Sequence, residues 1–143
     1  MVINVILLIL AILAMEAIAN FTHRYVMHGF LWVLHESHHV PRTGTFELND
    51  LFAFFFSVPS IVLIYIGSYH YAPALWVGLG IAAYGLIYFI FHDVIVHKRL
   101  TFPYKFKSAY MLRIIQAHKL HHAVSSKEGA VSFGFLYAQP ARE

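Results

Sequence analysis

The sequence has no cysteine among its 143 residues. This absence excludes disulfide bonds, thiolate-ligated zinc and any iron–sulfur cluster held by this chain alone. Charged residues are also scarce, at 12% of the chain, whereas a soluble domain usually has about a quarter. The glycine-rich fingerprint of a dinucleotide-binding fold is missing as well. We therefore expect one domain, residues 1–143, without an electron-carrying cofactor site of its own.

Hydrophobic residues make up 59% of the chain and concentrate in three long runs. The runs are Val2–Ala19, Leu51–Tyr69 and Ala74–Phe91, each close to the roughly 20 residues that a membrane-spanning helix needs. The first run ends in a sequence resembling a signal-peptide cleavage site, but no basic residue precedes it. We therefore expect a retained membrane helix and, for the whole chain, an all-α integral membrane protein with about three transmembrane helices.

The basic residues all lie on one side of the predicted membrane. The link at residues 67–73 contains a proline and no basic residue, so the second and third spans are expected to form a hairpin. Segments 21–50 and 92–143 then share one side, and together they contain every lysine and arginine: Arg24, Arg42, Lys98, Arg99, Lys105, Lys107, Arg113, Lys119, Lys127 and Arg142. The positive-inside rule predicts that this side is cytoplasmic and that the N-terminus is outside.

Two further segments are too short or too charged to cross a membrane. From Leu100 to His122, aromatic and aliphatic residues alternate with lysine and arginine, which predicts an interfacial helix on the cytoplasmic side. Val131–Ala138 is a short aromatic-rich run that we expect to pack against the membrane face. Asn49-Asp50 precedes the second span and is expected to cap its helix.

Ten of the 11 histidines fall into four clusters that repeat across the two halves of the chain. Each half has an HxxxxH pair at the cytoplasmic end of a predicted span and an HxxHH triplet after it. The clustered residues are His23, His28, His35, His38, His39, His92, His97, His118, His121 and His122. His70, which stands alone in the hairpin link, is expected to be an interfacial residue.

The spacing within these clusters bears on metal binding. Residues three and four apart share one face of a helix, so each HxxHH is expected to direct three imidazoles to one place. Residues five apart lie about 140° apart on an α-helix, so each HxxxxH needs a helix end or a π-type bulge to converge. Ten nitrogen ligands exceed what one ion can use and suit two. Imidazole accepts zinc, copper, iron or nickel, so the ligand type alone does not choose the metal.

A few polar residues accompany the histidines. Glu16, Asn20 and His23 share a helix face, so Glu16 and Asn20 either orient an imidazole or only bond to each other to fix helix packing. Asp93 either orients its neighbour His92 or is a simple helix-end residue. Glu36 lies inside a histidine triplet but is expected to face solvent.

The aromatic residues of the second and third spans are expected mostly to face lipid or to pack between helices. Some of them should line a slot for an elongated ligand. The residues concerned are Phe52, Phe54, Phe55, Phe56, Tyr84, Tyr88, Phe89 and Phe91.

The residues around the histidines extend the pattern over nearly the whole chain, in the stretches His23–Gly29, His35–His39, Phe46–Leu51, Tyr88–Asp93, Ala117–Ala123, Lys127–Gly129 and Val131–Tyr137. With them the sequence resembles the membrane fatty-acid hydroxylase superfamily, and within it the bacterial-type β-carotene 3-hydroxylases. The resemblance also implies the plasma membrane of a bacterium. The chain ends soon after the last of these stretches, which leaves open whether a C-terminal tail is missing.

This resemblance implies a non-haem centre of two iron ions, replaceable by zinc in a purified sample, and O2 as the oxidant. It implies hydroxylation of C3 of carotenoid β-ionone rings, from β-carotene through β-cryptoxanthin to zeaxanthin. The carotenoid would enter from the lipid phase, and electrons would come from a partner such as an acidic ferredoxin on the basic face. A homo-oligomer is possible, and no nucleic-acid partner is expected. Two alternatives remain: a related fatty-acyl or sterol hydroxylase or desaturase, and a metal transporter or sensor.

Overall fold

The computed structural model describes residues 1–41, 44–100, 103 and 105–137, and within them every regular element is a helix. In chain order these are α1 (Val2–Phe21), η1 (Thr22–Phe30), α2 (Trp32–His39), α3 (Asp50–Tyr69), α4 (Ala72–Tyr88), η2 (Phe89–Val96) and α5 (Ala109–His122), where η marks a π-helix. The all-α prediction is confirmed. Arg42, Arg142 and Ala138 lie outside the described residues.

The three predicted spans are confirmed as helices long and apolar enough to cross a membrane. Each π-helix continues the α-helix before it, so the first and third spans extend to Val2–Phe30 and Ala72–Val96, and the second is Asp50–Tyr69. Their outer surfaces are strongly apolar: Leu13, Phe54 and Leu86 are each at least 60% exposed. Side chains of this kind are stable against lipid and would be costly in water.

Helix α4 lies at the centre of the bundle and packs against both α1 and α3, while α1 and α3 make little contact with each other. Glycines allow these close approaches. A Cβ added at Gly78 would lie 2.8 Å from the backbone nitrogen of Ile64 in α3, and one at Gly80 would lie 2.6 Å from Cβ of Ala11 in α1. Ser60 Oγ also donates a hydrogen bond across the α3–α4 interface, to the carbonyl of Gly78 at 2.8 Å. Small residues and interhelical hydrogen bonds of this kind hold membrane helices together.

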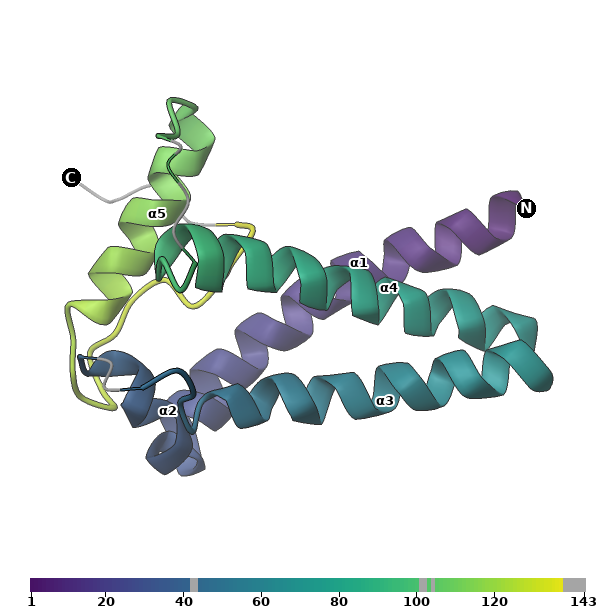
Figure 1. The fold of residues 1–143 in the computed structure, drawn as a ribbon, viewed down its shortest axis with the longest axis horizontal. Helices are drawn as coiled ribbons and strands as arrows, with labels where there is room; N and C mark the ends of the chain where they lie inside the picture. Colours follow the sequence, from purple (N-terminus) through teal and green to yellow (C-terminus); the bar gives the residue numbers. More distant parts are fainter. Residues whose placement is uncertain (42–43, 101–102, 104, 138–143) are drawn as a thin grey trace.

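The two ends of the bundle differ in content. The N-terminus and the α3–α4 connection lie at one end, and α2 and α5 lie at the other (Figure 1). His70 follows the last residue of α3 and is therefore at the first end. The segments that carry the ten clustered histidines (η1, α2, η2 and α5) gather at the second end.

The interfacial helix expected over Leu100–His122 is shorter than predicted. It begins at Ala109, and the described residues 98–100, 103 and 105–108 are not helical. Two features stop a helix here: Lys98 has a φ of 52°, outside the right-handed helical region, and Pro103 has no N–H to donate. The segment after α5 contains no regular element as far as residue 137, and it passes across the histidine end of the bundle.

Candidate metal centre

The two HxxxxH pairs lie on the two π-helices. His23 and His28 are both in η1, and His97 directly follows η2, which contains His92. The N–H of His97 bonds to the carbonyl of His92 at 2.9 Å, a link between residues five apart. Because this i to i+5 bonding aligns residues five apart, each pair presents both imidazoles on one face. The π-type bulges expected from the spacing are confirmed.

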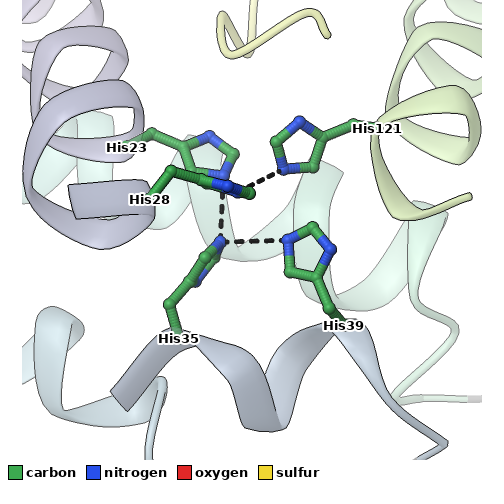
Figure 2. Close-up of side chains that lie close together, drawn as sticks. All are labelled: His23, His28, His35, His39 and His121. Carbon is green, nitrogen blue, oxygen red and sulfur yellow. Dashed lines mark hydrogen bonds between the residues drawn. The ribbon is translucent and has the colours of Figure 1, made fainter. Parts of the chain in front are cut away.

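The structure gathers all ten histidines into two groups of five. In each group the potential ligand nitrogens lie within 4.8 Å of one another. The first group is His23, His28, His35, His39 and His121, and the second is His38, His92, His97, His118 and His122. Figure 2 shows the first group, whose rings converge from η1, α2 and α5.

Each HxxHH triplet is divided between the two groups. The prediction that each triplet directs three imidazoles to one place is therefore wrong. His38 joins the second group although its neighbours His35 and His39 are in the first, and His121 makes the reverse exchange. Helix geometry explains the division. On an ideal helix, residue i+4 is about 40° from residue i, whereas residue i+3 is about 60° away in the opposite direction. The outer histidines therefore point together and the middle one points about 100° away from the last, toward the other group.

In the first group, every Nδ1 donates a hydrogen bond outward to an oxygen. The acceptors are the carbonyls of Phe133 (from His23, 3.1 Å), Lys127 (His28, 2.9 Å), Val124 (His39, 2.8 Å) and Val131 (His121, 3.0 Å), and Oδ1 of Asn49 (His35, 2.7 Å). An oxygen acceptor requires the proton to be on Nδ1, which leaves each Nε2 with a lone pair.

These lone pairs face one another. Nε2 of His35 is 3.1 Å from Nε2 of His23 and 3.2 Å from Nε2 of His39, and the Nε2 atoms of His28 and His121 are 3.1 Å apart. With every Nδ1 already protonated, no hydrogen bond can form between neutral rings at these contacts. A cation at the point of convergence would turn the repulsion into attraction, so the donor set fits a metal ion.

The second group is bordered by charged residues instead. His38 Nδ1 donates to Glu47 Oε2 at 2.9 Å, and His92 Nδ1 lies 3.5 Å from Asp93 Oδ1. Within the group, Nε2 of His38 approaches Nε2 of His92 at 3.0 Å, and the Nε2 atoms of His97 and His118 are 2.9 Å apart. In the described part of the chain, the buried Nε2 of His122 has no hydrogen-bond partner. This orphaned nitrogen also fits a site that takes a metal.

Arg99 organises the carboxylates around the second group. Its guanidinium lies 3.0 Å from Asp93, 2.7 Å from Asp50 and 3.3 Å from Glu47. Burial alone would lower the pKa of Arg99, but the hydrogen bond to Asp50 and the three negative charges raise it overall. Arg99 therefore stays charged and fixes the loop before α3 against η2.

Outside the spans, burial keeps the clustered imidazoles neutral. It lowers the pKa of His35 and of His121 to about 3 and that of His122 to about 2, with a further contribution from neighbouring histidines. The pKa values of His38 and His118 are also lowered well below their usual value, first by burial. Neutral imidazole is the form that binds a metal, so these groups are ready to do so at neutral pH.

Glu16 makes neither of the two contacts expected from the sequence. Its Oε1 accepts hydrogen bonds from the backbone N–H groups of Phe135 (2.9 Å) and Leu136 (2.8 Å), and its Oε2 accepts one from the hydroxyl of Tyr84 (2.8 Å). In the described residues it contacts no histidine directly, and Asn20 is an exposed neighbour of Gly134. Glu36 is exposed, as expected.

Residues 131–137, which we call the strap, cover both groups. Phe133 places its ring 5.5 Å from that of His23 and 5.2 Å from that of His121 in the first group. Phe135 is buried and lies 5.5 Å from His92 of the second group. Glu16 thus supports the first group indirectly, by holding the strap whose Phe133 carbonyl accepts from His23.

Sequence reasoning missed several of these partners. Glu47 and Asn49 bind His38 and His35, but in the sequence they are only polar residues ahead of an apolar run. Asn49 is the first residue before α3, yet its side chain bonds to His35 and not to the helix end. Most other partners are backbone carbonyls, which no residue type reveals.

An apolar cavity of about 430 Å³ leads from the two groups into the membrane-spanning part of the bundle. His23 and His92, one from each group, lie in its wall. Three helix faces complete the wall, with lining residues at intervals of three or four: Met15, Ala19 and Thr22 on α1 and η1, Phe52, Phe56, Ser60 and Ile64 on α3, and Ile81, Gly85 and Tyr88 on α4. Phe89 of η2 lines it as well. Phe133 and Phe135 close it on the strap side.

Comparison with known proteins gives a consistent result. The family model described as fatty acid hydroxylase matches residues 8–138. The chain is 52% identical to the β-carotene hydroxylase of Pseudescherichia vulneris over 139 residues, and this match covers 97% of this chain and 79% of that protein. It is 50% identical to the β-carotene hydroxylase of Pantoea ananas, over 96% of this chain and 78% of that protein. A chloroplastic β-carotene hydroxylase 1 of Capsicum annuum is 43% identical over 88% of this chain and 41% of its own length. No solved structure matches significantly.

Proposed function

This chain belongs to the fatty acid hydroxylase family, and we propose that it hydroxylates C3 of the β-ionone rings of carotenoids, converting β-carotene to β-cryptoxanthin and then to zeaxanthin. One observation carries the proposal: an apolar cavity between membrane-spanning helices ends at two converging groups of five histidines. A soluble substrate would need polar groups along such a wall, whereas a carotene offers none to bind. The names of the related proteins supply β-carotene as the substrate.

The ten histidines would hold two iron ions, one per group. Bound iron supplies the oxidising power, and the overall reaction is R–H + O2 + 2 electrons + 2 H⁺ → R–OH + H2O. Imidazole sites accept zinc as well, so a purified sample that contains zinc would be consistent with this proposal. In the first group, the outward Nδ1 hydrogen bonds fix each ring so that its Nε2 points inward.

The chain's other residues position the substrate and exclude water. The aromatic side chains of Phe52, Tyr88 and Phe89 offer flat apolar surface to a ring and a conjugated chain. Phe133 and Phe135 separate the cavity from the solvent side of the strap. We expect the carotenoid to enter sideways from lipid between α1 and α3, because these helices pack on α4 and not on each other.

The length of the cavity matches one half of a C40 carotenoid. At ~1.5 Å per residue it extends along α4 and η2 for roughly 16 Å, from Ile81 to His92. The two rings of such a carotenoid are about as far apart as the hydrocarbon core is thick, roughly 30 Å. One ring would therefore be oxidised per binding event.

Electrons would enter from the opposite side of the centre. A surface recess there is lined by His38, His39, His97, His118 and His122, with Lys119 and the apolar pair Val40 and Pro41 at its edge. Two further lysines are exposed close in sequence to these histidines: Lys98 follows His97, and Lys127 is five residues after His122. The mixture of positive charge and a small apolar contact fits an acidic one-electron carrier such as a ferredoxin.

We also propose that this end of the molecule faces the cytoplasm of a bacterium. The basic residues that the structure describes lie in the segments at the histidine end, and neither the N-terminus nor the α3–α4 connection has any. Lysine and arginine accumulate on the cytoplasmic side of membrane proteins.

The test is a pigment profile. The gene is expressed in carotene-producing bacteria under air, and the extracted carotenoids are separated and identified. Zeaxanthin and β-cryptoxanthin are expected, and a His92→Ala variant with the same expression level should leave β-carotene unchanged. Unaltered carotenoids together with newly hydroxylated or desaturated fatty acyl chains or sterols would instead favour another enzyme of the family.

A further inference from the structure

The glycines of the spans fall into two kinds. At Gly67, Gly78 and Gly80 an added Cβ would collide with a neighbouring helix, so helix packing requires these glycines. At Gly85 an added Cβ would meet no atom within 4 Å. Glycine is among the poorest helix formers, and Gly85 lies in the interior of α4. Packing gives no reason for a glycine at this position.

The space beside Gly85 is the cavity itself. Gly85 lines it, together with Tyr84 on one side and Tyr88 and Phe89 in the next turn toward the histidines. Gly85 precedes His92 by two helical turns, or roughly 10 Å along the axis, on the same helix face. This is about where the base of the ring and the first part of the polyene would lie when the far edge of the ring is at the centre.

The opposite walls near the histidine end are also partly small. Ala19 on α1 and Ala53 on α3 line the same cavity. The missing side chain at Gly85 therefore adds width at a level of the cavity where the aromatic rings of Phe52, Tyr88 and Phe89 leave little room. A β-ionone ring with its two geminal methyl groups is much wider than an unbranched methylene chain, and only the ring needs this width.

We propose that Gly85 determines substrate specificity by keeping the cavity wide enough for a ring-terminated chain. The proposal rests on the proposed carotenoid hydroxylation, because it assumes that the cavity receives the substrate. Side chains at position 85 exclude the ring in proportion to their volume, while an unbranched chain still fits. Closely packed interiors respond to single methyl groups, so the effect is graded.

The experiment compares Gly85→Ala, Gly85→Val and Gly85→Leu with the unaltered protein. Each variant is purified in lipid nanodiscs, and its metal content and thermal midpoint are measured first. Steady-state hydroxylation of β-carotene gives kcat and KM, and β-carotene retained by zinc-loaded protein gives binding without turnover. Leu86→Phe is the matched control, because Leu86 is the next residue, is 60% exposed and does not line the cavity.

We expect KM for β-carotene to rise a few-fold in the alanine variant and at least about 10-fold in the leucine variant, with metal content unchanged. Retained β-carotene should fall in parallel, and Leu86→Phe should resemble the unaltered protein. Stearic acid, an unbranched chain, should displace retained β-carotene more effectively from the narrowed variants than from the unaltered protein. Equal KM and equal retention across the series would overturn the role of Gly85. If the leucine variant loses its metal or its thermal transition, the alanine and valine variants decide. If the unaltered protein does not hydroxylate β-carotene, the proposed function fails, independently of the series.

Discussion

At the scale of single residues, the two histidine groups differ in what surrounds them. The first is oriented by carbonyl oxygens and one amide, all uncharged, whereas the second is bordered by Glu47, Asp93 and Arg99. A carboxylate that accepts from Nδ1 increases the electron density on the coordinating nitrogen. The two ions would therefore be held with different strength and by different partners.

Replacing Glu47 with glutamine should weaken metal binding by the second group specifically. The hydrogen bond from His38 survives in part, but the negative charge is lost, and changes of this type cost roughly 10–100-fold in metal affinity. Metal retained after dialysis against a weak chelator, measured by elemental analysis, should fall from near two ions per chain toward one. Glu36→Gln, on the helix α2 that carries His38, is the control and should keep both ions, because Glu36 is exposed. Two tightly held ions in Glu47→Gln would contradict this role.

Glu16 should act through the strap. In Glu16→Ala the backbone N–H groups of Phe135 and Leu136 lose their acceptor, and unsatisfied buried groups cost about 1–3 kcal/mol each. The strap should loosen and admit water, so we expect at least about a 10-fold loss of turnover and more O2 consumed per product. Glu16→Gln keeps one carbonyl oxygen and should lose less turnover. Tyr84→Phe removes only the hydrogen bond to Glu16 Oε2 and tests that contact alone. If the alanine variant keeps both its turnover and its yield of product per O2, Glu16 has no effect on the reaction.

At the scale of elements, the sequence could predict the π-helices but not the division of the triplets. A five-residue spacing between ligands is incompatible with a regular α-helix, so a distortion could be expected from His23 and His28 alone. The assignment of His38 and His121 to the opposite groups depends on how α2 and α5 face each other. The 60° offset of the middle histidine from the first directs it to another metal only when a second site lies on that side. The extent of α5 was overestimated because the apolar pattern from Leu100 to Ala109 resembles a helix but contains Pro103, and Lys98 just before it has a left-handed backbone.

The exchanged histidines give a prediction that needs only metal counting. His38→Ala should cost the ion of the second group, although its sequence neighbours belong to the first. The double variant His38→Ala with His92→Ala should then lose little more metal than either single variant, because both remove ligands of one ion. His38→Ala combined with His28→Ala should lose both ions. If the first pair loses two ions and the second pair one, the assignment of the groups is wrong.

At the scale of the whole molecule, the bundle separates two tasks along its length. Among the described residues, none at the end with the α3–α4 connection is basic, and the helices that lead to it are the membrane spans. The other end has the histidines, the strap and the charged loops. The number of spans was predictable, since it depends only on apolar length. The cavity was not, because whether Phe52 or Tyr88 lines a cavity or packs against a helix depends on how α1 and α3 sit on α4.

The proposed orientation can be tested with single introduced cysteines, for which a chain without native cysteine is well suited. His70→Cys and Ser125→Cys both place the thiol at exposed positions, one at each end of the bundle. A membrane-impermeant thiol reagent applied to intact spheroplasts should label position 70 and not position 125. Inverted vesicles should give the reverse pattern, and detergent should expose both. Labelling of both positions from one side would refute the three-span orientation.

The dimension of the cavity relative to its substrate predicts how the reaction proceeds in time. A cavity that extends along α4 for roughly 16 Å cannot reach two rings about 30 Å apart, so the carotenoid must leave and re-enter in the reverse direction for its second hydroxylation. A time course on β-carotene with O2 and a ferredoxin reducing system should therefore show the mono-hydroxylated product rising first and then falling. Adding a large excess of fresh β-carotene at the maximum should delay the dihydroxylated product, because the released intermediate must then compete for the same cavity. If the dihydroxylated product forms from the start and the added β-carotene does not delay it, both rings are reached without release. A second protomer would then have to supply the second centre.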